Sequence, residues 1–268
     1  MRRYLTYAAL GAFFCIPAAG QKPTPEQQRQ TLDTAREIAI HYASKLPNFM
    51  CNEQVERTDQ VQHTGQLLTV SHYDHLIIQL SYAGQKEDYK LVSINGSPTT
   101  QPLSSLDGII TGGEFGSLQL GVFEPSSATD FQWKEATTLR KHRAAVYTYR
   151  IARANSHYML GRRLDDGKLA PVAAGYHGEV VLDQDTSRVL RLTADADDIP
   201  KETGITASSL QVDYDFVDVA GGKHLLPSHS DSRMEHGDRK LGNVVTYTAY
   251  HKFEVDSSID FGKQVLRP

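Results

Sequence analysis

The chain has 268 residues, of which 40% are hydrophobic and 22% charged, with 20 Gly, 11 Pro and 2 Cys. These proportions are typical of a folded globular protein and exclude a disordered chain, a collagen-like chain and a small disulfide-stabilised domain. With 28 basic and 32 acidic side chains, the formal net charge is -4. No global positive field therefore attracts nucleic acid or an anionic membrane.

The first twenty residues predict a secretory signal peptide. Arg2 and Arg3 precede an apolar run from Leu5 to Ile16, and small residues follow up to Gly20. This order is typical of a signal peptide cleaved after Gly20. The apolar run is shorter than the roughly 20 residues that a transmembrane helix needs. We therefore expect residues 1–20 to be removed, and the chain to be exported to the periplasm or the exterior without a stable membrane span.

Cleavage at that position leaves Cys51 as the one remaining cysteine, so we expect no internal disulfide. Cys51 has the strand parity of Phe49 and Val55, and no His or Lys adjoins it in the sequence. The pattern indicates a buried small side chain and not a nucleophile.

A helix is predicted over residues 25–46. Thr24 is the expected N-cap, Pro25 occupies the first helical position, and Gln27 completes a capping box. Apolar residues then recur at steps of three and four: Leu32, Ala35, Ala39, Tyr42 and Leu46. This spacing gives the helix one apolar face. Pro47 ends it, because a proline disfavours helical geometry at the residue before it.

From Asn48 onward the apolar period changes from the helical value to two. Apolar residues alternate with polar ones in runs such as Leu76–Tyr82, Phe131–Trp133, Tyr147–Ile151 and Leu210–Phe216. Turn sequences such as Asn95-Gly96 separate these runs. One apolar and one polar face is the pattern of an antiparallel sheet, for which we expect about ten to twelve strands. No repeat or linker divides residues 21–268, so we predict a single β-rich domain.

A second, short helix is predicted over residues 113–123. Phe115, Leu118, Val122 and Phe123 have helical spacing, and Pro125 ends the run. The segment contains three glycines, which cost roughly 1 kcal/mol each relative to alanine in a helix interior. The helix must therefore be held by packing against an apolar surface, which makes it a candidate lid.

No sequence motif predicts catalysis. Ser117 lacks the glycine two positions later that a nucleophile elbow requires. His72 and His75 are three residues apart, which places them on opposite faces of a strand, and no HExxH sequence occurs. We interpret these histidines as surface residues and predict no catalytic residue, metal or cofactor.

Acidic and basic runs predict turns and surfaces. Asp183 and Asp185 lack the glycine and glutamate of a calcium loop and fit turn chemistry. The acidic run 195–198 fits a solvated edge. Arg140–Arg143 lies at an expected hairpin turn without stacking aromatic residues, so we predict no nucleic-acid binding.

Aromatic side chains occupy many of the alternating positions that form the apolar face of the predicted sheet. Two interpretations remain open: a packed core, or a curved sheet whose concave face holds an apolar ligand beneath the helices over 25–46 and 113–123. Under the second interpretation the predicted ligand-binding residues are Tyr82, Phe131, Trp133, Tyr147, Tyr149, Tyr214, Phe216, Phe115 and Leu118.

The order of elements resembles the LolA-like lipoprotein-carrier superfamily. The similarity in amino-acid sequence is confined to residues 178–227. It covers Gly178–Leu192 around an Asp-containing turn, Leu210–Phe216 and Leu225-Leu226-Pro227. Leu46-Pro47-Asn48-Phe49 and Gly113–Ser117 also resemble segments of uncharacterised secreted bacterial proteins. The resemblance implies an open antiparallel half-barrel with helices over an apolar cavity, in proteins that carry lipoproteins, bind lipids or sense envelope stress. It implies no catalytic residue.

We therefore expect a mainly β, α+β fold: a curved antiparallel sheet or open half-barrel lidded by the N-terminal and inserted helices. The leading functional hypothesis is a noncatalytic exported protein that binds an apolar ligand or an acylated protein in the concave face. The alternative is an envelope protein-interaction or stress-sensor module that binds its partner at an exposed sheet edge, for which Ser228–Glu235 is the expected strand.

Overall fold

The computed structural model describes residues 22–61, 69–106, 109, 112–163 and 169–253. The predicted signal peptide lies outside these residues. The helices are α1 (Pro25–Ile40), α2 (Tyr42–Lys45) and α3 (Ser117–Phe123), with short 3-10 turns η1 (Leu103–Ser105), η2 (Pro125–Ser127), η3 (Arg153–Asn155) and η4 (Lys201–Thr203). The strands are β1 (Phe49–Val61), β2 (Thr69–Ala83), β3 (Lys86–Ile94), β4 (Ser97–Pro98), β5 (Asp130–Leu139), β6 (His142–Ile151), β7 (Met159–Arg163), β8 (Leu169–Ala173), β9 (Gly175–Asp183), β10 (Val189–Asp197), β11 (Ile205–Val219), β12 (Gly222–His236) and β13 (Arg239–Lys252).

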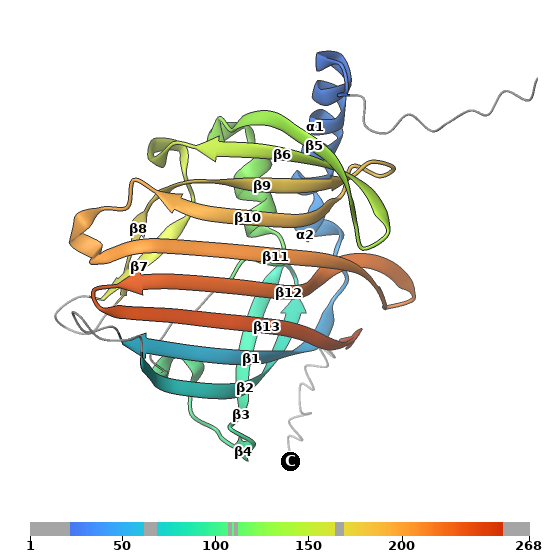
Figure 1. Cartoon of the computed structure of the whole chain (residues 1–268). Helices are drawn as coiled ribbons and strands as arrows, with labels where there is room; N and C mark the ends of the chain where they lie inside the picture. Colours follow the sequence, from blue (N-terminus) through green and yellow to red (C-terminus); the bar gives the residue numbers. More distant parts are fainter. Residues whose placement is uncertain (1–21, 62–68, 107–108, 110–111, 164–168, 254–268) are drawn as a thin grey trace, which may run out of the picture.

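Eleven of the described strands form one antiparallel sheet in the order β4-β3-β2-β1-β13-β12-β11-β10-β9-β6-β5 (Figure 1). Strands β7 and β8 form a separate two-stranded hairpin. The large sheet is curved and its two end strands do not meet, so it is an open half-barrel. The predicted fold class is therefore confirmed. Strand β1 pairs along its length with β13, which brings the first and last described strands together.

The predicted exposed edge at Ser228–Glu235 is wrong. This segment belongs to β12, which lies inside the sheet between β11 and β13. Ser230, for example, is in register with Val212 on one side and Val245 on the other. The polar run suggested an edge, but Ser230 and Ser232 are buried on the inner face, Asp231 and Arg233 alternate with them, and the backbone is paired on both sides. Among the described strands, the ends of the sheet are β4 and β5.

The N-terminal helix begins as its sequence predicts. Thr24 Oγ1 accepts a hydrogen bond from the Gln27 backbone N–H at 3.3 Å, and Gln27 Oε1 accepts one from the Thr24 N–H at 2.8 Å. Helix α1 ends at Ile40, and after His41 the chain adds the single turn α2. Helices α1 and α2 both lie within residues 25–46, the span predicted to be helical.

The inserted helix starts at Ser117, four residues after the predicted start. Gly113 and Gly116 have φ values of +97° and +147°, which lie outside helical geometry. Gly116 instead forms the N-cap of α3. An added Cβ at Gly116 would lie 2.7 Å from Ala43 Cβ, so glycine at this position allows α3 to approach α2 closely.

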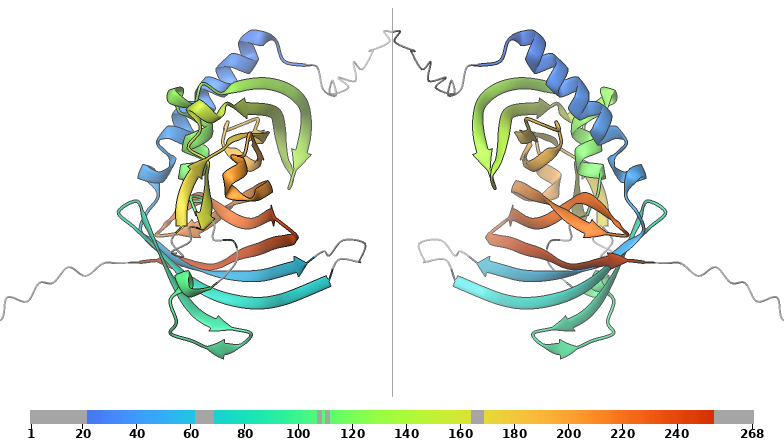
Figure 2. Two further views of the ribbon diagram at one scale, coloured as in Figure 1. Left: turned by 90° about the vertical axis from the view of Figure 1, so that its left-hand side faces the viewer. Right: turned by 90° about the vertical axis from the view of Figure 1, so that its right-hand side faces the viewer.

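The helices and the β7–β8 hairpin cover one face of the sheet (Figure 2). Two clusters of buried side chains form the core on this face. One joins Ala35, Ala39 and Phe123 of the helices to Tyr147 and Tyr214 of the sheet. The other surrounds Phe49, Tyr82 and Phe115. The helices are therefore held by apolar contacts with the concave face, as the weak intrinsic stability of α3 requires.

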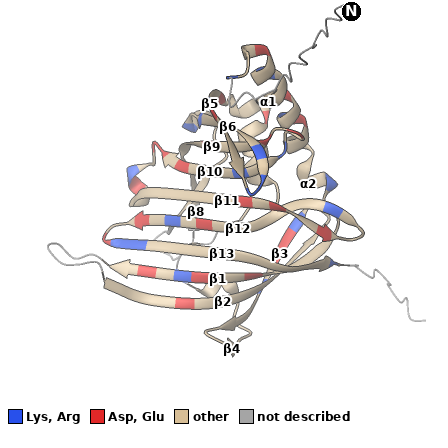
Figure 3. Ribbon diagram, turned by 45° about the vertical axis from the view of Figure 1, so that its right-hand side comes forward, with Lys and Arg blue, Asp and Glu red and all other residues tan. Residues whose placement is uncertain are grey.

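Acidic and basic residues are interspersed along the strands (Figure 3). Lys134 pairs with Glu179 at 2.6 Å, and Arg150 pairs with Asp197 at 2.8 Å. The turn between β5 and β6 reaches as far as β11, where Arg140 Nε donates to Asp215 at 2.8 Å. The predicted hairpin turn at Arg140 is therefore confirmed, but its side chain is not simply solvated, because the guanidinium ties this hairpin to β11.

Candidate functional site

Five of the predicted ligand-binding residues are buried in the core. Tyr82, Phe115, Tyr147, Tyr149 and Tyr214 are each at most 3% exposed. Tyr82 stacks on Phe49 with ring centroids 5.1 Å apart, and Phe115 lies beside the same two rings. These contacts are those of a packed aromatic core beneath the helices. The role of these residues in ligand binding stays a prediction.

The other predicted residues are half-buried around this core. Phe131 stacks on Phe123 of α3 at 5.3 Å, and Trp133 meets Tyr147 edge-on at 5.4 Å. Phe216 lies beside His142, with ring centroids 5.9 Å apart. Leu118 packs against the core and also lines a cavity of the concave side beside helix α3, called the α3 cavity below.

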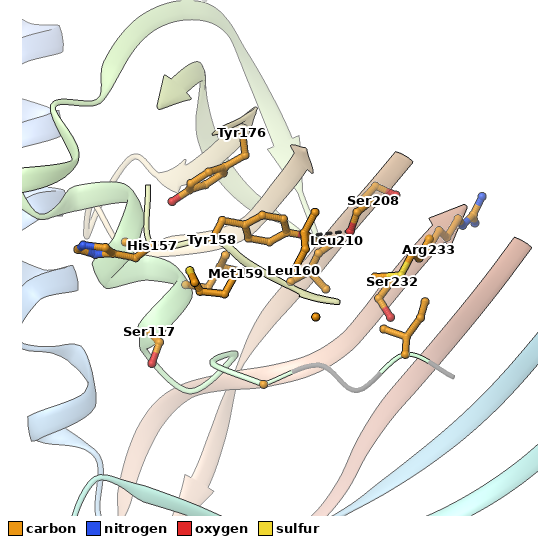
Figure 4. A pocket seen from close by; sticks show the side chains of 17 residues that line it. Ser117, His157, Tyr158, Met159, Leu160, Tyr176, Ser208, Leu210, Ser232 and Arg233 are labelled. Carbon is orange, nitrogen blue, oxygen red and sulfur yellow. Dashed lines mark hydrogen bonds between the residues drawn. The ribbon is translucent and has the colours of Figure 1, made fainter. Parts of the chain in front are cut away.

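This cavity, of about 250 Å³, lies next to the packed core. Helix α3 and strands β7, β11 and β12 line it (Figure 4). Its wall is formed by Ile109, Gly112, Ser117, Leu118, Gly121, His157, Tyr158, Met159, Leu160, Gly161, Tyr176, Ser208, Ser209, Leu210, Ser232, Arg233 and Met234. The sequence identified Leu118 in this set and missed the others.

Helix α3 is fixed over the cavity by contacts at both of its ends. Tyr214 donates its hydroxyl to the Glu114 carbonyl at 3.0 Å, just before the helix. At the other end, Arg36 Nε donates to the Phe123 carbonyl at 3.2 Å and Thr129 donates to the Val122 carbonyl at 2.6 Å. These bonds satisfy carbonyl groups that the last turn of a helix leaves free. The cavity wall is thus held by α1 and the sheet together.

Two tyrosines form part of the cavity wall. Tyr158 packs on Tyr176 with ring centroids 5.2 Å apart, and its hydroxyl lies 3.2 Å from Ser208 Oγ (dashed line in Figure 4). Burial raises the pKa of both tyrosines above the ordinary value of 10. Both are therefore neutral near pH 7 and offer hydroxyl groups to the cavity without charge.

A histidine and a serine in the wall do not form a catalytic pair. His157 Nδ1 is 2.5 Å from Glu124 Oε1, so the histidine has a carboxylate partner. In Figure 4 the Ser117 hydroxyl points away from His157, and no hydrogen bond joins these two residues in the described structure. A serine nucleophile needs a base within hydrogen-bond reach. The arrangement in this structure lacks that geometry.

A row of polar residues crosses the concave face next to the cavity. In register across neighbouring strands, Ser232 of β12 faces Asn243 of β13, Asn243 faces Arg57 of β1, and Arg57 faces Asp74 of β2. Arg57 forms an ion pair with Asp74, which also accepts a hydrogen bond from Asn95 Nδ2 at 3.0 Å. Burial alone would raise the pKa of Asp74, but the bonds from Arg57 and Asn95 outweigh burial and lower this pKa. The charged end of the row is therefore internally neutralised.

A buried carboxyl group lies four residues before Arg57 on the same face of β1. Glu53 is 7% exposed and lines a smaller adjoining cavity of about 60 Å³. Burial, reinforced by the negative charges of Glu114 and Glu87, raises the pKa of Glu53 from 4.5 to about 8. The side chain is therefore protonated and uncharged at neutral pH.

Three other residues considered from the sequence, Cys51, His72 and Asp183, make contacts within the fold. Cys51 is fully buried, as its parity predicts, and burial raises the pKa of its thiol. His72 Nε2 lies 2.8 Å from Asp74 although most of its side chain is exposed. Asp183 Oδ1 accepts from the backbone of Asp185 and Thr186 at 2.9 and 2.8 Å, which confirms the predicted turn chemistry. Within the described residues, no group of three His, Cys, Asp or Glu side chains is placed to hold a metal ion.

Comparisons with known proteins give similarity at the level of structure. No protein-family model and no curated protein matches the sequence. A LolA superfamily protein from Nitrosomonas europaea is 12% identical, with a TM-score of 0.34 over 89% of this chain and 98% of that chain. An outer membrane lipoprotein-sorting protein domain from Vibrio parahaemolyticus is 11% identical, with a TM-score of 0.37 over 87% and 95%. A DUF1329 family protein from Desulfovibrio piger is 12% identical, with a TM-score of 0.32 over 86% and 94%.

In the part of the chain that the structure describes, no helix is both long and apolar enough to cross a membrane.

Proposed function

We propose that this protein is a noncatalytic, exported binding protein that holds an apolar or acyl-chain ligand in the concave face of its half-barrel. One observation carries the proposal: the cavity of about 250 Å³ beneath α3 and β7. This volume lies just under the roughly 300–1,000 Å³ of pockets that bind drug-sized molecules. The ligand expected here is accordingly small, or is a segment of a longer chain.

The composition of the wall supports an apolar ligand. Leu118, Leu160 and Leu210 contribute aliphatic surface from three different elements, and Tyr158 and Tyr176 add aromatic surface. Burying apolar ligand surface against such a wall contributes roughly 25 cal/mol per Å². Six residues of the wall carry hydroxyl groups, which can orient a bound molecule by hydrogen bonding: Ser117, Tyr158, Tyr176, Ser208, Ser209 and Ser232.

The predicted aromatic residues extend this proposal. Leu118 and Tyr176 belong to the wall and also pack in the aromatic core, so the cavity adjoins that core. A chain longer than the cavity would reach Phe115 and Tyr214 only with displacement of α3. This short helix is held by a few hydrogen bonds and apolar contacts, so we propose that it acts as the lid.

Native mass spectrometry of the protein purified from its own exported fraction, followed by solvent extraction, tests the proposal directly. We expect a stoichiometric apolar molecule or acyl chain. An apo mass that persists when the protein is incubated with the neutral fluorescent probe N-phenyl-1-naphthylamine, with no probe fluorescence gained, would contradict the proposal.

A pair of variants on α3 locates the site. Leu118→Trp places a larger side chain into the cavity, so we expect probe binding to fall at least tenfold. Leu120 is 38% exposed on the same helix and does not belong to the cavity wall, so Leu120→Trp is the matched control and should bind as the wild type does. Equal binding by all three proteins would move the ligand away from this cavity.

A further inference from the structure

Two neighbouring residues of the polar row are buried without satisfying all of their polar atoms. Ser232 is 4% exposed and Asn243 is 6% exposed. Among the residues that the structure describes, Ser232 Oγ and Asn243 Oδ1 have no hydrogen-bond partner. Leaving such an atom buried and unpaired costs roughly 1–3 kcal/mol, so each one requires an explanation. A ligand group that occupies this position would supply the missing partners.

Both atoms lie where one ligand group can reach them. Ser232 and Asn243 are directly opposite each other on β12 and β13, so their Cβ atoms are about 5 Å apart. Ser232 lines the α3 cavity (Figure 4). Asn243 lines the adjoining cavity of about 60 Å³ and a further one of about 400 Å³, and Ile109 lines all three. The pair therefore lies where the α3 cavity meets these neighbouring cavities.

The hydrogen-bonding character of this position is fixed by Asn243. Its Nδ2 donates to the Ile109 carbonyl at 2.8 Å. That bond requires the nitrogen to face Ile109, which leaves Oδ1 as an acceptor for the ligand. Ser232 Oγ can both donate and accept. A complementary ligand group must therefore carry at least one N–H or O–H donor.

The charge of the surroundings selects further among such groups. Arg57 is the next residue in the row, but its guanidinium is already paired with Asp74. A free carboxylate placed here would meet the acceptor oxygen of Asn243 and would bury a negative charge, which is costly without a dedicated partner. A hydroxyl or a primary or secondary amide satisfies both residues without charge.

We propose that the ligand of the α3 cavity is an amphiphile with an uncharged hydroxyl or amide head group, which hydrogen-bonds to Ser232 and Asn243 while its apolar chain fills this cavity. This proposal rests on the proposed binding function and adds the class of head group to it. Ser232 is the orienting residue whose removal leaves the chain contacts intact.

A matched series of ten-carbon ligands tests the head group. Decane, 1-decanol, decanamide and decanoate are compared at pH 7.5 by displacement of N-phenyl-1-naphthylamine. We expect decanol and decanamide to bind about tenfold more tightly than decane and decanoate, since a hydrogen-bonded polar group contributes about a factor of ten. Ser232→Ala should reduce the affinity for decanol and decanamide about tenfold and leave decane unchanged.

The matched control is Ser230→Ala. Ser230 is buried on the same strand and face, but its hydroxyl lies 3.4 Å from Tyr247 OH and it does not line the α3 cavity. This variant should keep the wild-type ranking of ligands.

The outcomes separate the two proposals. If the probe and all four ligands fail to bind, the binding function itself is wrong. If the chains bind with equal affinity whatever their head group, or if Ser232→Ala leaves the ranking unchanged, the head-group proposal alone is overturned and the binding function stands. A wild-type preference for decanoate would likewise overturn it.

Discussion

Replacing Glu53 by glutamine should stabilise the protein at neutral pH. The folded protein holds the pKa of Glu53 at about 8, whereas the unfolded chain has the ordinary value of 4.5. Between these two values Glu53 is protonated when folded and ionised when unfolded, so unfolding releases a proton. Raising the pH therefore favours the unfolded state. The buried carboxyl lowers stability progressively from about pH 4.5 to about pH 8.

The size of the effect follows from the two pKa values. Each pH unit between them changes the free energy of unfolding by about 1.4 kcal/mol. Integrated from 4.5 to 7, the loss is about 3 kcal/mol. Glutamine has nearly the same shape and no ionisation, so Glu53→Gln should be about 3 kcal/mol more stable than the wild type at pH 7. At pH 4 the two proteins should have nearly equal stability.

Urea unfolding at pH 4, 5.5, 7 and 8 measures this difference. The matched control is Glu135→Gln, an exposed glutamate on β5, whose effect should stay within about 0.5 kcal/mol at every pH. A constant difference between Glu53→Gln and the wild type across this range would refute the reasoning. So would a glutamine variant that is less stable at pH 7.

Two further predictions concern how the sheet is held. Arg140→Met removes hydrogen bonds to Asp213, Asp215 and two backbone carbonyls. Because Arg191 still pairs with Asp213, we expect the free energy of unfolding, measured with urea, to fall by about 2 kcal/mol. Equal stability of the variant and the wild type would contradict this prediction. Gly178→Ala would drive a Cβ into the Thr193 carbonyl group, so thermal unfolding should show a loss of about 3 kcal/mol or more. Gly221→Ala, where the added atom meets nothing within 4 Å, should cost only about 1 kcal/mol.

Side-chain alternation was sufficient to predict the sheet and its inner face. Tyr147, Tyr149 and Tyr214 have inward parity in the sequence and are buried under the helices in the structure. The N-terminal helix could also be predicted from the sequence, because Thr24 and Gln27 form a local capping box that depends on no distant contact.

The cavity could not be predicted in the same way, for two physical reasons. Ser208, Ser232 and Asn243 are polar, and polar residues normally indicate solvent, whereas here they share the inner face with the core. The register of β11 and β12 also shifts near Tyr214 and Pro227, and a shift of one residue reverses the parity of every later position in the strand. Whether aromatic residues of correct parity fill the interior depends on how the elements cross in space. The alternation of apolar and polar residues carries no information about how the elements cross.

The pairing of β1 with β13 has a consequence for how the chain folds. The strand that comes after the N-terminal helix finds this partner only in the last described strand, so the contact order of the sheet is high. To form contacts so distant in sequence, the chain must lose conformational entropy in closing a long loop before the contacts can stabilise it. This cost slows folding. Until β13 has been made and has paired, the sheet consists of two separate sets of strands, β1 to β4 on one side and β5, β6 and β9 to β12 on the other, with nothing in the described sheet to join them. The last strand therefore completes the half-barrel, and loss of the C-terminal part of the chain would divide it.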